Sequence, residues 1–221
     1  MNFSTLFRIG ENLNLDRKTL IYLRWIAILG QLTALNFVYF FLKLDFPIIL
    51  THFVILIGLI TNLFLQFRIK SILLKDLYAS FFLIYDLFQL SFLLYLTGGI
   101  YNPFSILIIV PAIVSSTFLS MGTTIILVIL TVSFLFVLTK FHYPFPGLHD
   151  NSFIFPDLYV IGFILSIMIG LLFLCYFGIR FSGESKRRSD AVNKLQQAIA
   201  KEYELESLGG QAAAAAHSLG T

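Results

Sequence analysis

The chain has 221 residues, of which 58% are hydrophobic and only 12% are charged, and its mean hydropathy is +0.88. Soluble domains are about half apolar and about a quarter charged, and 25 Phe with 10 Tyr exceed what a water-soluble core of this size can bury. This composition excludes an ordinary soluble enzyme and predicts a protein in lipid. The basic isoelectric point near 9.0 does not indicate nucleic-acid binding, because the Lys and Arg residues lie at the ends of apolar runs.

Residues 1–20 precede the first apolar run. Their apolar side chains could lie on the membrane surface as a short amphipathic segment. The run that follows is too long for the hydrophobic region of a cleavable signal peptide. We therefore expect a cytoplasmic N-terminal segment and no cleaved signal.

Six apolar runs of about 20 residues are long enough to cross a bilayer as helices. They cover residues 21–42, 48–67, 77–96, 103–120, 122–139 and 158–179. A backbone in lipid must satisfy its own hydrogen bonds, so we expect an all-α fold with a six-helix transmembrane bundle over residues 21–179. Pro111 falls inside the fourth run and is expected to free the carbonyl of Leu107 and kink that helix.

Lys and Arg are distributed unequally around these runs. Thirteen of them, including Arg24 at the start of the first run, are assigned to the side of the two termini, and only Lys43 and Lys140 fall on the other side. The positive-inside rule therefore predicts a multi-pass protein with both termini in the cytoplasm.

Residues 97–104, between the third and fourth runs on the outer side, read Thr-Gly-Gly-Ile-Tyr-Asn-Pro-Phe. The two glycines are expected to stop the third helix with positive φ angles, and Asn102 and Pro103 to cap and start the fourth. A tight turn and a capped helix explain this motif completely. The alternative is a quinone site, because a helix N-terminus offers unpaired N–H groups and the aromatic residues offer flat surface. The residues of that candidate site are Gly98, Gly99, Tyr101, Asn102, Pro103 and Phe104.

Asp86 lies near the middle of the third run, with Gln89 on the same helix face. An ionisable side chain at that depth costs roughly 2.5–3.5 kcal/mol, which makes it a functional candidate, but a hydrogen-bonded carboxyl that packs the bundle explains it equally well. Its possible partners are Gln31, Asn36 and Asn62. Asp86 is twelve residues from Gly98, or about 18 Å along a helix, so one quinone ring cannot contact both. We interpret Asp86 as a packing or transmission residue.

The segment 140–157 contains His142, His149 and Asp150, but their spacing is not specific for a metal, and no metal site is expected. This Pro- and aromatic-rich segment is more simply placed at the membrane interface, over the turn at 98–104. The single cysteine, Cys175, lies in an apolar run and has no partner for an intrachain disulfide.

Residues 180–221 are polar and then alanine-rich, and they are expected to form a cytoplasmic helix. Two apolar sets recur in it at a spacing of 3–4, which favours pairing with a second copy of the chain. They are Val192, Leu195 and Ile199, and then Leu205, Leu208, Ala212, Ala215 and Leu219. His217 is about 200° around the helix from Ala215, so it faces water if Ala215 faces the seam, and a neutral imidazole can attack a γ-phosphate. A lone His on an alanine-rich helix is, however, more often without function.

Residues 212–221, Ala-Ala-Ala-Ala-Ala-His-Ser-Leu-Gly-Thr, resemble the phosphoacceptor box of the RegB/PrrB-type redox-sensing histidine kinases. That family is also similar upstream, with six membrane helices and an outer Gly-Gly-x-x-Asn-Pro-Phe loop that residues 98–104 match at every fixed position. The resemblance implies a homodimeric protein-histidine kinase of the bacterial inner membrane that senses ubiquinone or another quinone. It also implies that His217 accepts phosphate from ATP and Mg²⁺ and passes it to a response regulator, and that Thr221 assists dephosphorylation.

Three features depart from the family pattern. Ser218 stands where most such kinases have an acidic residue that polarises the histidine. The given sequence ends at Thr221, so the ATP-binding domain is expected to be missing and this stretch alone is not expected to be active. Cys175 lies in a membrane span and does not match the family's regulatory cysteine, which belongs to the kinase portion.

Two other functions fit parts of the sequence. A small transporter or channel would line a path with Asp86 and Pro111, but it leaves the long cytoplasmic helix unexplained. A quinone-linked structural subunit of a redox complex would need partner subunits and no histidine phosphorylation.

Overall fold

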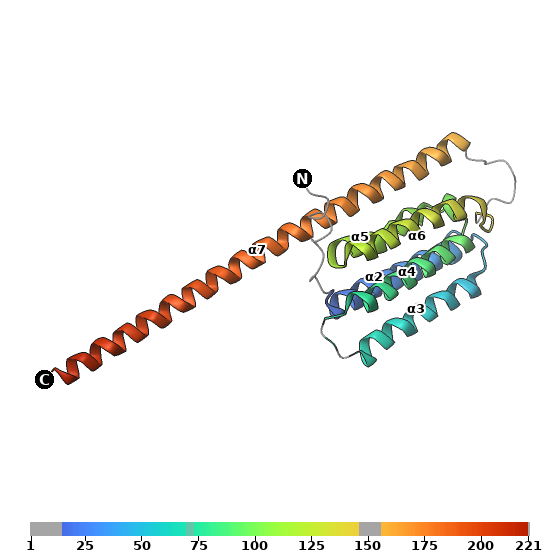
Figure 1. Ribbon diagram of the computed structural model, residues 1–221. Helices are drawn as coiled ribbons and strands as arrows, with labels where there is room; N and C mark the ends of the chain where they lie inside the picture. Colours follow the sequence, from blue (N-terminus) through green and yellow to red (C-terminus); the bar gives the residue numbers. More distant parts are fainter. Residues whose placement is uncertain (1–14, 70, 72, 146–155, 221) are drawn as a thin grey trace. The chain divides into compact units, whose positions relative to one another are not determined.

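The computed structural model describes residues 15–69, 71, 73–145 and 156–220 (Figure 1). Over these ranges the chain forms helices and no strand, apart from an isolated β-bridge between Asp16 and Leu73. The all-α prediction is therefore confirmed. In chain order the elements are α2 (Arg17–Asn36), the π-helix η1 (Phe37–Phe41), α3 (Ile48–Arg68), α4 (Asp76–Leu96), the 3-10 helices η2 (Gly99–Tyr101) and η3 (Pro103–Ile109), α5 (Val110–Phe118), α6 (Met121–Lys140) and α7 (Asp157–Leu219).

Five helices in the described part of the chain are long and apolar enough to cross a membrane. They are Arg17–Phe41, Ile48–Arg68, Asp76–Leu96, Met121–Lys140 and Asp157–Gly209. The fourth predicted span corresponds to a shorter helix, Pro103–Phe118, made of 7 residues of 3-10 helix and 9 of α-helix. A 3-10 helix rises about 2.0 Å per residue and an α-helix about 1.5 Å, so this composite helix is about 28 Å long. The tighter winding therefore gives sixteen residues nearly the reach of a hydrocarbon core of about 30 Å.

The loss of a hydrogen bond expected at Pro111 does not occur in this helix. Pro111 lies in the first turn of α5, where a missing N–H removes no helical hydrogen bond. The carbonyl of Leu107 is not freed, because it accepts a hydrogen bond from the N–H of Val110 in the 3-10 pattern. A change of helix type between Ile109 and Val110 thus replaces the expected break.

The chain divides into two compact units, residues 1–179 and residues 180–221. In the first unit α4 is central, since it packs against α3, α5 and α6, and α3 in turn packs against α2 (Figure 1). The part of α7 within this unit contributes one apolar face, spaced at three and four residues, to the core. Its members are Val160, Ile164, Ile167, Leu171 and Cys175. The opposite faces of the helices leave many large apolar side chains exposed, as lipid-facing surfaces do.

The second unit consists of the remainder of α7. Every side chain from residue 187 to residue 209 is exposed. The apolar residues predicted to pair with a second copy are therefore uncovered in the single chain, at Val192, Leu195, Ile199, Leu205 and Leu208. The function assigned to each segment of the chain stays a prediction.

Candidate functional site

The turn after α4 has the backbone that its sequence predicts. Gly98 and Gly99 both have positive φ angles, of 106° and 60°. A Cβ atom on Gly98 would collide with Phe145, and one on Gly99 would collide with His142 and the carbonyl of Leu138. The glycines therefore allow the end of α6 and the residues after it to pack directly on the turn. The expectation that this segment lies over the turn is confirmed for residues 141–145, and it means that the glycine surfaces are covered by protein.

Asn102 caps η3 as predicted, and its side chain also forms hydrogen bonds to both sides of the turn. Its Oδ1 accepts a hydrogen bond of 2.9 Å from the N–H of Phe104. Its Nδ2 donates to the Thr97 hydroxyl at 2.7 Å and to the Thr97 carbonyl at 3.1 Å. Because both amide protons and the carbonyl oxygen have partners, this side chain joins the end of α4 to the start of η3.

The remaining residues of the predicted quinone site differ in how they are presented. Tyr101 is half-buried and meets His142 edge to face, with ring centroids 5.2 Å apart. Pro103 and Phe104 are exposed, and 46% of the Phe104 surface is accessible. Phe104 is thus the exposed aromatic side chain of this turn.

Asp86 has a charged partner, Arg24, which the sequence alone placed among the cations at the ends of the apolar runs. The Nε of Arg24 donates to Oδ1 of Asp86 at 2.9 Å, and its Nη2 donates to the hydroxyl of Thr61 at 2.7 Å. Only 4% of the Arg24 side chain and 20% of the Asp86 side chain is exposed. The guanidinium also lies 5.2 Å from the ring centroid of Phe82 and 5.6 Å from that of Tyr85. This cluster links α2, α3 and α4 inside the bundle.

Two sequence-based interpretations are therefore wrong. Arg24 is not an exposed cation at the end of a helix, because α2 begins at Arg17 and carries Arg24 two turns further, where only 4% of its side chain is exposed. The partners expected for Asp86 are engaged elsewhere: Gln31 accepts from Gln89 at 3.3 Å, and Asn36 donates to the carbonyl of Leu32. Asn62 is within 3.5 Å of the carbonyl of Ile21. The useful signal was that an acidic residue inside a span needs a counter-ion at a similar depth.

Gln89, about one helical turn after Asp86 on α4, forms a second polar contact. It bonds to Gln31 of α2, and its amide lies so close to Gly58 of α3 that a Cβ atom there would overlap it. Gln89 therefore packs the same three helices that the ion pair joins.

Sequence reasoning missed a second acidic contact, at the start of α4. The carboxylate of Asp76 accepts hydrogen bonds from the N–H and the hydroxyl of Ser120, both at 2.8 Å, and from the hydroxyl of Thr123 at 2.9 Å. An acidic residue in the first turn of a helix is common, so its sequence position alone carried no signal for this contact.

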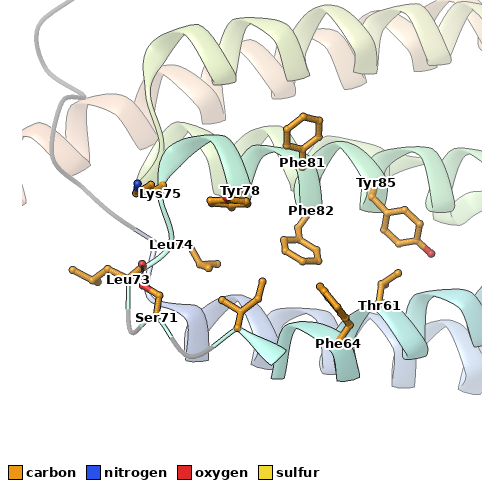
Figure 2. A pocket seen from close by; sticks show the side chains of 11 residues that line it. Thr61, Phe64, Ser71, Leu73, Leu74, Lys75, Tyr78, Phe81, Phe82 and Tyr85 are labelled. Carbon is orange, nitrogen blue, oxygen red and sulfur yellow. Dashed lines mark hydrogen bonds between the residues drawn. The ribbon is translucent and has the colours of Figure 1, made fainter. Parts of the chain in front are cut away.

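A cavity of about 710 Å³ opens between α3 and α4, near the turn that joins them (Figure 2). Figure 2 shows Thr61 and Tyr85 at one end, Ser71 and Lys75 at the other, and aromatic rings between them. The rings between them belong to Phe64, Tyr78, Phe81 and Phe82, and Ile69, Leu73 and Leu74 complete the lining. No sequence motif marked this cavity, because it depends on how two helices pack.

The predicted phosphoacceptor, His217, is exposed on α7. Thr221, the residue predicted to assist dephosphorylation, lies outside the described residues. Among the residues that the structure describes, no group of three or more His, Cys, Asp or Glu side chains is placed to hold a metal ion. His149 and Asp150 also fall outside those residues.

Two known proteins are similar to most of this chain. Both are described as "Sensor histidine kinase RegB" and come from Cereibacter sphaeroides, one of them from strain ATCC 17023. Each is 38% identical to this chain over 205 residues, which cover 92% of the chain and 44% of the relative. No family model and no solved structure matches the chain.

The alignment includes the greater part of the membrane helices described above, and the chain spans less than half the length of the curated relatives it matches. The presence of apolar helices of spanning length agrees with a membrane protein of this kind. Over the region that the sequences share, the chain belongs to the RegB-type sensor histidine kinases.

Proposed function

We propose that this chain is the sensor part of a two-component histidine kinase that responds to the redox state of the membrane through a quinone. The observation that carries the proposal is the 38% identity to RegB over 92% of the chain. The protein would cross the bacterial inner membrane several times, with both termini in the cytoplasm and the turn at 97–104 on the outer side. It would act as a homodimer that transfers phosphate to a response regulator.

In the phosphotransfer step, an imidazole nitrogen of His217 attacks the γ-phosphorus of ATP, the bond to the ADP oxygen breaks, and ADP leaves. A response-regulator carboxylate then takes the phosphoryl group. The ATP-binding machinery would be supplied by the remainder of such a kinase, with Mg²⁺ on the phosphates. The exposure of His217 supports this role, because a γ-phosphate and a carboxylate must each reach the same ring in line.

This role is tested by incubating the chain in nanodiscs with the isolated ATP-binding region of a RegB-type kinase and radiolabelled ATP. We expect acid-labile, alkali-stable label on the chain and none on His217→Gln. His142→Gln is the matched control, since His142 is a half-buried histidine of the other unit. Label that survives in His217→Gln would exclude this phosphoacceptor.

Quinone sensing is proposed for the turn that holds Gly98, Gly99, Tyr101, Asn102, Pro103 and Phe104. Its support is the exposed ring of Phe104 on a turn that Asn102 holds rigidly. Since a rigid turn keeps such a ring in place, binding would lose little conformational entropy. Asn102→Ala would remove the cap as well as any contact, so it cannot separate folding from binding.

The sharper test compares Phe104→Ala with Leu107→Ala, because the two residues lie on the same helix and are 46% and 45% exposed. Equilibrium binding of a decyl-tailed benzoquinone to the chain in nanodiscs should weaken in Phe104→Ala and stay unchanged in Leu107→Ala. Equal affinities in both variants would remove this turn from the sensing role.

Homodimer formation is proposed for the uncovered apolar residues of α7. Val192, Leu195 and Ile199 follow the 3–4 spacing of a helix that pairs with its own copy. Leu195→Glu should convert the dimer to a monomer in a mass measurement on solubilised protein, whereas Lys194→Glu should leave it dimeric.

A further inference from the structure

One end of the cavity between α3 and α4 carries a lysine without a counter-ion. Lys75 immediately precedes α4, lines the cavity and has an exposed side chain. No carboxylate among the residues that the structure describes forms an ion pair with it. Ser71 lines the same end, but its hydroxyl already donates to the carbonyl of Leu73. The ammonium of Lys75, with its three donors, is therefore the group at this end that can bind an acceptor.

The other charged groups near this end also favour an anion. The guanidinium of Arg17 donates to the carbonyl of Ile69, which lines the cavity, and Arg68 precedes Ile69 at the end of α3. Two carboxylates belong to the same region, and both have hydrogen-bond donors already. Asp16, whose backbone pairs with the cavity wall, caps α2, and Asp76 accepts hydrogen bonds from the start of α6. The cations are thus left to attract an anion from outside the chain.

Between its two ends the cavity is lined by aromatic rings and aliphatic side chains. Phe64, Tyr78 and Phe81 are each more than half exposed, whereas Leu74 on the wall is 2% exposed. The cavity is therefore closed by protein behind and open on the face that a membrane helix presents to lipid. Its volume of about 710 Å³ is within the range of about 300–1,000 Å³ that ligand pockets occupy.

The length of the cavity matches one leaflet of a bilayer. Figure 2 shows Ser71 and Lys75 at one end and Thr61 and Tyr85 at the other. Tyr85 is ten residues after Lys75 on α4, which corresponds to about 15 Å of helix, or half of a hydrocarbon core of about 30 Å. At the far end, the hydroxyl of Thr61 already donates to the carbonyl of Gly58. A ligand with its charged head at Lys75 would therefore extend an apolar chain toward the middle of the membrane.

We propose that this cavity binds one phospholipid whose headgroup has a net negative charge. Its phosphate would accept hydrogen bonds from the ammonium of Lys75, and one of its acyl chains would lie along the rings of Phe64 and Phe81. A zwitterionic phospholipid offers the same chain but carries a cation of its own, which the basic residues at this end would repel. A soluble anion offers the charge but leaves the apolar part of the cavity empty.

This site goes beyond the proposed sensor function and does not depend on it. Lys75 and the turn that begins at Thr97 are at opposite ends of α4. Phe104→Ala, which tests the turn, should therefore leave lipid binding at the cavity unchanged, so the two proposals can fail separately.

The experiment measures lipid binding to the whole chain in detergent micelles by native mass spectrometry. Phosphatidylglycerol and phosphatidylcholine with identical acyl chains are titrated separately, and the dissociation constant of the first bound lipid is determined for each. Wild type is compared with Lys75→Gln, Lys75→Arg and the control Lys140→Gln, because Lys140 is an exposed lysine at the end of α6 and outside the cavity. Phe64→Ala and the control Phe53→Ala test the contact with the acyl chain, since both residues belong to α3 and are 54% and 56% exposed.

We expect wild type to bind the anionic lipid about 5-fold more tightly, because one basic residue near a membrane surface contributes about that factor. Lys75→Gln should lose this preference, and Lys75→Arg and Lys140→Gln should keep it. Phe64→Ala should weaken the binding of both lipids, and Phe53→Ala should not. Equal affinity of wild type for the two lipids, or the same preference in Lys75→Gln as in Lys140→Gln, would overturn the proposal. An equal loss in Phe64→Ala and Phe53→Ala would also overturn it, because the chain would then lie anywhere along α3.

Discussion

Breaking the ion pair between Arg24 and Asp86 should destabilise the bundle unequally, depending on which partner is removed. Arg24 is 4% exposed and contacts Asp86 at 2.9 Å and Thr61 at 2.7 Å. In Asp86→Leu a guanidinium stays in the bundle without its counter-ion, and it cannot lose its proton. In Arg24→Leu a carboxyl is left, and a carboxyl can take up a proton and become neutral.

The expected magnitudes follow from this asymmetry. Removing one partner of a buried ion pair costs about 3–5 kcal/mol, and we expect Asp86→Leu to lie in that range. Arg24→Leu should cost less, because the remaining group can be neutralised. The double variant should recover most of the loss, since two apolar side chains of similar volume often replace a buried pair at little cost. A coupling energy of at least about 2 kcal/mol between the two positions is therefore expected.

The assay is reversible unfolding in mixed micelles, followed by helical circular dichroism, on the four proteins of this double-mutant cycle. Gln89→Leu serves as the comparison, because Gln89 lies on α4 like Asp86 but makes only a neutral hydrogen bond, to Gln31 of α2. Such a bond is worth about 1 kcal/mol. If Asp86→Leu costs no more than Gln89→Leu, or if the double variant is as unstable as the sum of the singles, the reasoning is refuted.

Three further results are expected. Asp76→Ala should destabilise by about 1.5–3 kcal/mol in the same assay, because its carboxylate accepts three hydrogen bonds from the start of α6, and Asp76→Asn should lose less. Gly98→Ala should cost about 1–3 kcal/mol because of its φ angle of 106°, whereas Gly30→Ala, which has open space around it, should be neutral or slightly stabilising. A reporter enzyme that is active only outside the cytoplasm should be active when fused at Lys43 and when fused at Lys140. An inactive fusion at either position would contradict the proposed orientation.

The helices and the turn after α4 were predictable because their causes are local. Apolar runs of about 20 residues identify spans without reference to neighbours. Gly98 and Asn102 have backbone roles that few other residues can fill, and the structure has a positive φ at the first and a capping side chain at the second. The 3-10 winding of Pro103–Ile109 was not predictable, because hydrophobic periodicity over seven residues does not separate a period of 3.0 from one of 3.6.

The polar contacts between helices were harder to predict because they depend on rotation and depth. The positive-inside rule counts a cation by its place in the chain, and Arg24 is close to the start of a run, so it was counted at the surface. Its burial follows from α2 beginning at Arg17 and from the depth of Asp86 on α4. The cavity was beyond sequence reasoning for the same reason, since its walls come from two helix faces whose rotation is set by packing.

Three of the polar contacts in the bundle involve α4, and they limit how this helix can move. Asp76 holds the start of α4 to α6, Asp86 holds its middle to α2, and Thr97 at its end is bonded by Asn102. The cavity, next to Asp86, and the turn that contains Asn102 thus lie at two places on one helix. A ligand at the turn that shifted α4 along its axis would have to break the charge-assisted hydrogen bonds of Asp76 and Asp86, each worth about 1.5–3 kcal/mol. A rotation of α4 that keeps these bonds costs less, so we expect ligand-induced movement of α4 to be rotational. Distances from α6 to spin labels on opposite faces of α4 should then change in opposite senses. Labels at different heights on one face of α4 should show no common shift along the helix axis.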